Sequence, residues 1–254
     1  MSVEPWRVAI AVAILACISV GALWTARARV GRDAAIAVVR AAVQLLAVAL
    51  IIAWVFKTPS AAWLYVAVML AAATWTSTSR IAWGRRAAWQ VAAAIAVGAA
   101  AAVVPVIVLN VLPRATESLL PFTAQILGGA MTAVSLVGLR MRDEATATWD
   151  EVEGWLALGA PPRKAAERLA RTAVGRALVP AIDQTRNAGI VVLPGAFVGL
   201  LLAGASPLEA AQVQLLVLVG LLAAESVAAV TIAQLLRRRA GSRRPAGATE
   251  RVQR

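Results

Sequence analysis

The sequence has no histidine and a single cysteine, Cys17. Without histidine, the chain cannot form a Ser-His-Asp triad or an HExxH zinc motif, and it lacks imidazole metal ligands. One cysteine excludes an internal disulfide framework and a cysteine metal cluster. The phosphate-binding pattern Gly-x4-Gly-Lys-Ser/Thr is also absent. These absences argue against an enzyme and against a nucleotide site of that kind within this chain.

Long apolar runs dominate what is present. Hydrophobic residues make up 61% of the chain, and the mean hydropathy is +0.76. A helix needs about 20 apolar residues to cross a hydrocarbon core of about 30 Å. We therefore predict an all-α, polytopic membrane protein with about seven transmembrane helices. The expected spans are residues 5–25, 34–56, 61–79, 87–112, 121–140, 188–204 and 209–236.

The net charge of +12 would suit a nucleic-acid partner, but the distribution of the charges indicates a membrane instead. Only Arg7, Lys57 and Arg114 fall on one side of the expected spans, whereas the other 22 of 25 basic residues fall on the opposite side. Basic loops stay inside. We predict an external N-terminus, an internal loop over residues 141–187 and an internal C-terminus, in the plasma (bacterial inner) membrane.

No linker divides the sequence. We predict one transmembrane domain over residues 1–236, with a cytoplasmic helical insert at about residues 141–187. The remainder, residues 237–254, is basic and contains glycine, proline and serine. Such a tail is expected to be disordered and attracted to anionic lipid.

The insert contains the signals for a helix, a tight corner and a second helix. Three acidic residues favour the positive end of a first helix dipole: Asp150, Glu151 and Glu153. Gly159 can adopt the left-handed conformation that ends this helix, and Pro161 or Pro162 can begin the next one. The second helix, residues 162–178, is amphipathic, with lysine and arginine along one side.

A few polar residues lie inside the expected spans. Arg40 and Gln44 are four residues apart and share a helix face. Glu225 lies about 16 Å from the end of its span, where an unpaired charge costs several kcal/mol. It is either a pathway carboxylate or a structural partner of Arg40 or of a glutamine, and Arg40 itself is shallow enough to reach the membrane surface. We take Arg40, Gln44, Gln214 and Glu225 as candidate pathway residues.

Glycine and proline interrupt several spans. Pro194-Gly195 divides the expected span at residues 188–204, and such breaks mark either moving, ligand-lining segments or packing devices. Small residues also recur at helical spacing, as in Gly195-x3-Gly199. They serve either packing within the chain or the interface of a homodimer.

From Arg40 onward, several motifs occur in an order that resembles one family of small ABC-transporter permeases. The motifs are Arg40-Ala-Ala-Val-Gln44-Leu, Leu158-Gly159-Ala160-Pro161, Leu178-Val179-Pro180-x2-Asp183-x5-Gly189, Leu193-Pro194-Gly195 and Leu202-Ala203-Gly204-x2-Pro207-x3-Ala211-x2-Gln214. The family includes bacterial iron-export permeases of the FetB type and the membrane subunit of a plant aluminium-tolerance transporter.

The resemblance implies a division of labour between subunits. Two copies of the chain would form the pore, and a separate ATP-binding subunit would hydrolyse ATP with Mg²⁺, so this chain would bind no cofactor itself. The residues assigned to coupling are Glu153, Leu158, Gly159, Ala160 and Pro161. The residues assigned to transmission or hinge motion are Pro180, Asp183, Pro194 and Gly195. Export of an iron-like metal ion or of another small solute is implied, and the metal-binding residues are unknown.

Two departures from the family pattern bear on the substrate. Ala196-Phe197 stand where the family has two methionines, and Glu225 stands where it has a small residue. Two other functions stay open at this point. One is an ion-coupled secondary transporter that uses Glu225, and the other is a membrane scaffold that recruits a soluble enzyme without transporting a solute.

Overall fold

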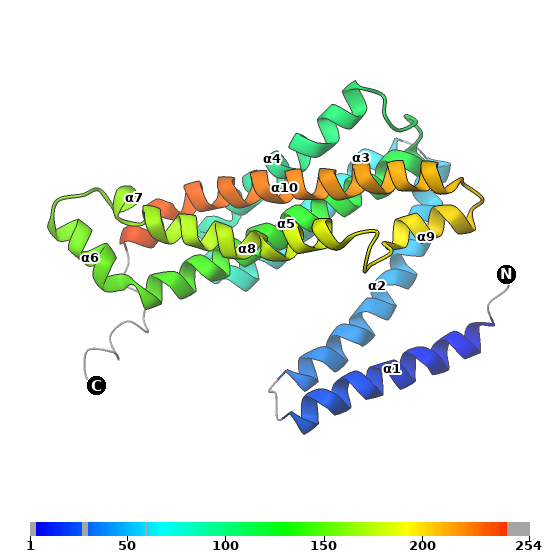
Figure 1. The fold of residues 1–254 in the computed structure, drawn as a ribbon, viewed down its shortest axis with the longest axis horizontal. Helices are drawn as coiled ribbons and strands as arrows, with labels where there is room; N and C mark the ends of the chain where they lie inside the picture. The colour runs from blue at the N-terminus through cyan, green and yellow to red at the C-terminus, as the bar shows by residue number, and fades with distance from the viewer. Residues whose placement is uncertain (1–3, 27–29, 59, 243–254) are drawn as a thin grey trace. The chain divides into compact units, whose positions relative to one another are not determined.

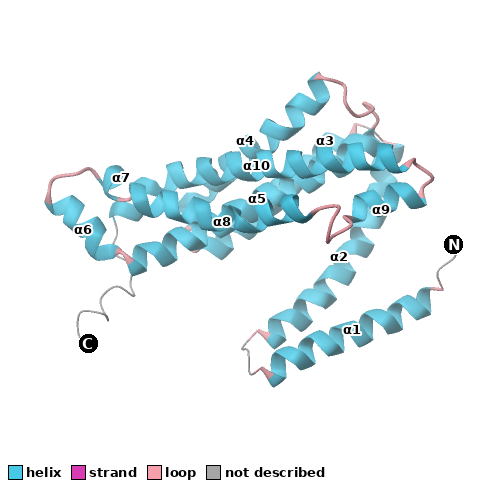
Figure 2. Cartoon of the chain, in the orientation of Figure 1, coloured by secondary structure: helices cyan, strands magenta, loops and turns pink. Residues whose placement is uncertain are grey.

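The computed structural model describes residues 4–26, 30–58 and 60–242. Its named elements are all helical and are joined by loops (Figure 2). Contacts divide the chain into two units, residues 1–60 and residues 61–254, and each is described by itself. The all-α prediction is confirmed.

The first unit contains α1 (Pro5–Thr25) and α2 (Gly31–Lys57), which contact each other. Gly31 lies against Trp24, since a Cβ at position 31 would meet Trp24 Cδ1 at 2.7 Å. Arg27 and Arg29, which contribute to the predicted charge bias, lie outside the described residues.

The second unit packs around α10. Its elements are α3 (Ala61–Ile81), η1 (Arg85–Ala87), α4 (Ala88–Val108), α5 (Thr116–Ala147), α6 (Trp149–Ala157), α7 (Pro162–Ala165), α8 (Glu167–Asn187), α9 (Gly195–Leu202) and α10 (Pro207–Ser242). Helix α10 contacts α4, α5 and α8 along its length (Figure 1). Ser206 and Glu209 cap its first turn, because the Ser206 amide donates to Glu209 Oε2 at 2.9 Å.

Small residues allow these helices to approach closely. A Cβ at Gly98 of α4 would lie 2.6 Å from the carbonyl oxygen of Ala224 and from the Cβ of Ala228, both in α10. A Cβ at Gly138 of α5 would lie 2.5 Å from Ile81. Close backbone approach is the expected source of association where lipid gives no hydrophobic drive. Packing within the chain therefore accounts for these glycines.

Six helices among the described residues are long and apolar enough to cross a membrane: α1, α2, α3, η1 with α4, α5 and α10. The chain is a multi-pass membrane protein. The predicted seventh span, at residues 188–204, is wrong as a single helix, because α9 has only 8 residues and extends about 12 Å. The chain breaks before it: Gly189 has φ +83° and Pro194 is the N-cap of α9.

Helices α8 and α9 instead lie alongside α10, one after the other. Both contact α10, and Figure 1 shows α8, the yellow loop and α9 in succession beside it. The direction of the chain in α8 and α9 is opposite to that in α10. A polar helix, a break and a short apolar helix therefore lie where one apolar helix was expected.

The C-terminal boundary also differs from the prediction. Helix α10 continues through Ser242, so residues 237–242 are helical and extend the last span. The rest of the expected tail, residues 243–254, lies outside the described residues.

Candidate functional site

Helix α6 has a buried base and an exposed tip. Trp149 and Val152 are 6% and 2% exposed and pack into the core. Trp155 and Leu158, in contrast, are 47% and 81% exposed. Glu153 is also exposed on this helix. One end of α6 is therefore fixed to the bundle, and the other presents apolar side chains to the surroundings.

The corner after α6 has the predicted geometry. Gly159 has φ +84°, the left-handed conformation expected for it. Its amide donates to the Leu156 carbonyl at 2.9 Å, and the Ala160 amide donates to the Trp155 carbonyl at 3.0 Å, which closes the end of the helix. Pro161 and Pro162 then begin α7. We call residues 153–161 the tip.

The helix after the corner is in two pieces, contrary to the single helix expected over residues 162–178. Helix α7 ends at Ala165, and α8 begins at Glu167 with Ala166 as its N-cap. Helix α8 then continues to Asn187, with Pro180 inside it. Pro180 and Asp183 therefore belong to the same helix that follows the tip.

Two ion pairs tie α8 to the preceding helices. Arg168 donates from Nε and Nη2 to the two oxygens of the Glu151 carboxylate on α6. Arg176 pairs with Glu144 near the end of α5, where Glu144 is only 8% exposed. The paired residues are 17 and 32 positions apart, and no local spacing pattern predicts such pairs. Sequence reasoning missed Glu144 and Arg176 altogether.

The end of α10 lies against α7. A Cβ at Gly241 would clash with the carbonyl oxygen of Pro162. Only glycine allows this approach without a shift of one segment. The last apolar span of the chain is thus in direct contact with the segment that follows the tip.

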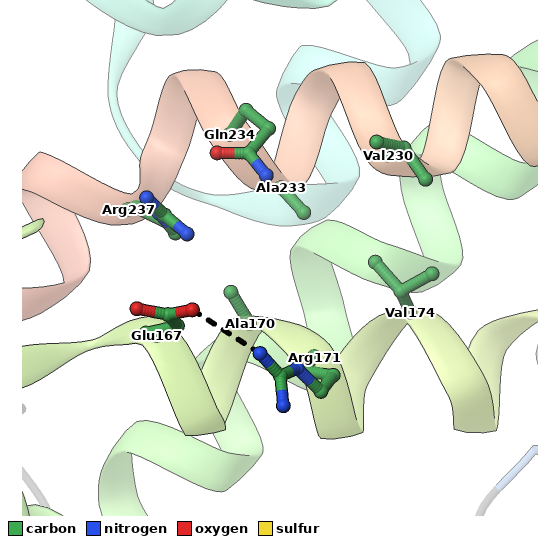
Figure 3. A pocket seen from close by; sticks show the side chains of 8 residues that line it. All are labelled: Glu167, Ala170, Arg171, Val174, Val230, Ala233, Gln234 and Arg237. Atoms are coloured by element: carbon green, nitrogen blue, oxygen red, sulfur yellow. Dashed lines mark hydrogen bonds and ion pairs between the residues drawn. The ribbon is translucent and has the colours of Figure 1, made fainter. Parts of the chain in front are cut away.

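A small cavity of about 180 Å³ lies between α8 and α10. Figure 3 shows Glu167 and Arg171 on α8, joined by an ion pair at 3.2 Å, facing Arg237 and Gln234 on α10. Val174 and Val230 lie at the other end of the cavity. Because Val174 and Val230 face each other, they show which parts of α8 and α10 lie side by side.

The outer side of α8 is polar beyond this level. Asp183 lies about 13 Å farther along the helix, beside the apolar part of α10. Its carboxylate is 3.8 Å from Arg186 Nη1, and both side chains are more than half exposed. Charged groups at membrane depth are costly against lipid. This face needs water or protein beside it.

Of the predicted pathway residues of α10, Gln214 is buried and Glu225 is half-buried. Gln214 is 6% exposed, and no described donor reaches its Oε1. Glu225 lies three helical turns farther on and faces α5, where a Cβ at Gly129 would meet its Oε1 at 2.8 Å. The structure places these two residues on nearly the same side of α10. No ion pair of Glu225 occurs among the described residues.

The other predicted pathway residues, Arg40 and Gln44, belong to the first unit. They line one shallow surface of α2 together with Ile36 and Val39. Their shared face is confirmed, and their role in a pathway stays a prediction. Pro194 and Gly195 cap and begin α9, where the structure shows a break between helices. In the described part of the chain, no three His, Cys, Asp or Glu side chains are grouped to hold a metal ion.

Comparison with known proteins identifies the family. Residues 5–240 match the family described as "Uncharacterised protein family (UPF0014)". The chain belongs to this family. The UPF0014 membrane protein STAR2 of Oryza sativa subsp. japonica is 33% identical over 196 residues, which cover 76% of this chain and 69% of that protein.

Bacterial relatives of the UPF0014 chain match it over a similar extent. The UPF0014 membrane protein YjkA of Bacillus subtilis (strain 168) is 29% identical over 82% of this chain and 84% of its own length. The probable iron export permease protein FetB of Escherichia coli (strain K12) is 28% identical over 79% and 78%. These relatives confirm the family resemblance. No solved structure matches the chain.

Proposed function

We propose that the chain is the membrane-spanning permease subunit of an ABC transporter, driven by a separate subunit that binds and hydrolyses ATP with Mg²⁺. The observation that carries this proposal is the tip, an exposed apolar corner on a buried, ion-paired base. Exposed tryptophan and leucine beside a glycine corner suit insertion into a groove of a soluble protein. The tip then faces the cytoplasm of a bacterial cell, as the loop charges indicate.

Transmission of movement follows from the contacts of the base. A displacement of α6 pulls α8 through the Glu151–Arg168 pair, and α7 presses on the end of α10 at Gly241. Both helices run from the tip into the membrane part of the chain. Pro180 breaks the hydrogen-bond ladder of α8, which makes the helix easier to bend there.

The polar face of α8 supports a homodimer in which two copies form the solute route. Asp183 and Arg186 cannot face lipid at low cost, whereas a water-filled route between copies would hydrate them. The solute is a metal ion such as iron, as the name of one relative suggests, or another small solute. Export is the proposed direction on the same ground.

Glu225 favours a second candidate, an ion-coupled secondary transporter, because it is a carboxylate inside an apolar span. One experiment separates the candidates. The full chain is purified from its native membrane, co-purifying ATP-binding proteins are identified, and solutes are tested for stimulation of their ATPase in proteoliposomes. ATP-dependent transport supports the permease, transport driven by an ion gradient alone supports the carrier, and an associated enzyme without transport indicates a scaffold.

A further inference from the structure

A second polar site lies away from the tip, where the ends of α3, α5 and α10 meet η1 and the start of α4. The site is a hollow of about 1360 Å³. Five arginines line it: Arg85, Arg86, Arg142, Arg238 and Arg239. None of the described residues that line the hollow is acidic. We call this site the arginine hollow.

Specific contacts build the corner that opens the hollow. The chain turns out of α3 with positive φ at Ala82 (+52°) and Gly84 (+83°). Between them, Trp83 donates its indole N–H to the Gly138 carbonyl of α5 at 3.0 Å. A left-handed alanine is strained, and surrounding contacts must hold it there. The corner is therefore a fixed feature that sets where Arg85 and Arg86 lie.

The positions of two further groups point to a ligand. Arg239 donates to the carbonyl oxygen of Arg86 at 2.8 Å, which brings two arginines of distant elements together. Gln90 is 7% exposed and donates to the Leu235 carbonyl at 3.0 Å. Its Oε1 is buried and meets no donor among the described residues. Buried acceptors without a donor are uncommon.

Among the described residues, the charge of the arginine hollow is unbalanced. Like charges that converge without a carboxylate repel one another, and a bound anion removes that repulsion. Guanidinium groups bind phosphate oxygens by paired, charge-assisted hydrogen bonds. The hollow also lies at the ends of membrane spans, and Trp83 is a residue type favoured at the membrane interface. A phosphate in the headgroup layer of the membrane supplies the anion and lies at the same level as the hollow.

We propose that the arginine hollow binds the headgroup of an anionic phospholipid. The guanidinium groups hold the phosphodiester oxygens, and Gln90 Oε1 accepts a hydrogen bond from a headgroup hydroxyl such as that of phosphatidylglycerol. Such a lipid would join α3, α4, α5 and α10 at the end of the bundle. This inference does not depend on what the chain transports.

The test measures lipid binding to the purified full chain. Dioctanoyl phosphatidylglycerol is titrated in detergent, and bound lipid is counted by native mass spectrometry. The triple variant Arg86→Gln/Arg142→Gln/Arg238→Gln is expected to bind about 100-fold more weakly, because each arginine that is removed weakens binding about fivefold. Unchanged affinity in this variant overturns the proposal. If the variant does not fold, Arg142→Gln alone is expected to weaken binding about fivefold, and an unchanged value again counts against it.

The control removes the same charge elsewhere. Arg7, Lys57 and Arg114 are exposed, lie outside the hollow and are expected on the opposite side of the membrane. Their joint replacement by glutamine is expected to leave lipid affinity within about threefold, since distant charges are screened. An equal loss in both variants would show general charge attraction and overturn a defined site.

Further ligands separate the source of the phosphate. Dioctanoyl phosphatidylcholine is expected to bind much more weakly than phosphatidylglycerol, and equal binding contradicts an anion site. Inorganic phosphate and glycerol phosphate are expected to compete poorly. Displacement of lipid by either at a similar concentration would show a site for free phosphate and overturn the lipid proposal. Phosphatidylmethanol lacks the hydroxyl, and affinity equal to that of phosphatidylglycerol overturns the contact assigned to Gln90.

Discussion

The base of α6 and the tip beside it differ in almost every physical respect. Trp149 and Val152 are buried, and two ion pairs bind the neighbouring helices to one another. One to two turns farther along, Trp155 and Leu158 are exposed, and no described neighbour lies within 4 Å of a Cβ built at Gly159. A rigid base and a free apolar tip are what a docking element needs, because movement of the tip is then passed to the bundle. The comparison predicts that changes at the tip alter coupling, whereas changes at the base alter stability as well.

The largest effect is expected at the corner. Gly159→Val places a β-branched residue at φ +84°, which costs about 1–2 kcal/mol and distorts the tip. We expect transport and ATPase stimulation to be abolished while membrane insertion is retained. Gly21→Val is the control, because Gly21 lies in open space with an ordinary φ. Wild-type transport by Gly159→Val would remove the coupling role of the tip.

Changes in the ion pairs around the base should lower the stability of the protein. Arg176→Gln leaves the Glu144 carboxylate buried without a charged partner, at an expected cost of about 2 kcal/mol. The double variant Glu144→Gln/Arg176→Gln should recover part of this loss. Thermal unfolding in detergent measures both. Arg171→Gln, in a pair that is largely exposed, should have almost no effect, and an equal loss there would contradict a special role for Glu144.

The contact between α10 and α7 should give a smaller effect. In Gly241→Ala, the new Cβ would meet the Pro162 carbonyl oxygen, so α7 must shift. We expect a loss of about 1 kcal/mol from overpacking and a partial loss of ATPase stimulation. Gly175→Ala is the matched control in an open, exposed part of α8. A variant at Gly241 that matches this control in both assays would show that the contact does not transmit movement.

The smallest change in stability is expected at Glu225. Glu225→Gln keeps the shape of the side chain, and no ion pair in the described second unit is lost. We expect lower transport of a cationic solute with nearly unchanged thermal unfolding. Glu209→Gln supplies the contrast, since it weakens the cap with Ser206 and should affect stability alone. Normal transport by Glu225→Gln would exclude it from the solute route.

Apolar patterning was sufficient to find α1 to α5 and α10, and turn chemistry was sufficient to place the corner at Gly159. Apolar patterning failed at residues 188–204, where high hydropathy predicted one span despite the helix-breaking residues Gly189 and Pro194-Gly195. The course of α8 beside α10 was also missed, because a helix with several charged residues does not look like part of a membrane segment. Its polar side becomes intelligible only when the neighbouring helix is known.

The contacts of the base could not be read from the sequence for a different reason. Glu144 and Arg176 are single charged residues in a basic chain, and nothing in their local pattern pairs them across 32 positions. The same holds for Gly241, whose need for a small side chain arises from a carbonyl of a distant segment. Such pairs depend on the path of the chain, which local propensity does not determine.

The central claim is that an ATP-binding subunit docks on the tip. The most direct test purifies the tagged full chain and measures the ATP-binding protein retained by the wild type and by Leu158→Glu. Leu158 is 81% exposed, so the substitution should not disturb folding. We predict stoichiometric retention by the wild type and at least a tenfold loss, about 1.4 kcal/mol, for Leu158→Glu with equal membrane insertion. Equal retention by both proteins would contradict docking at the tip.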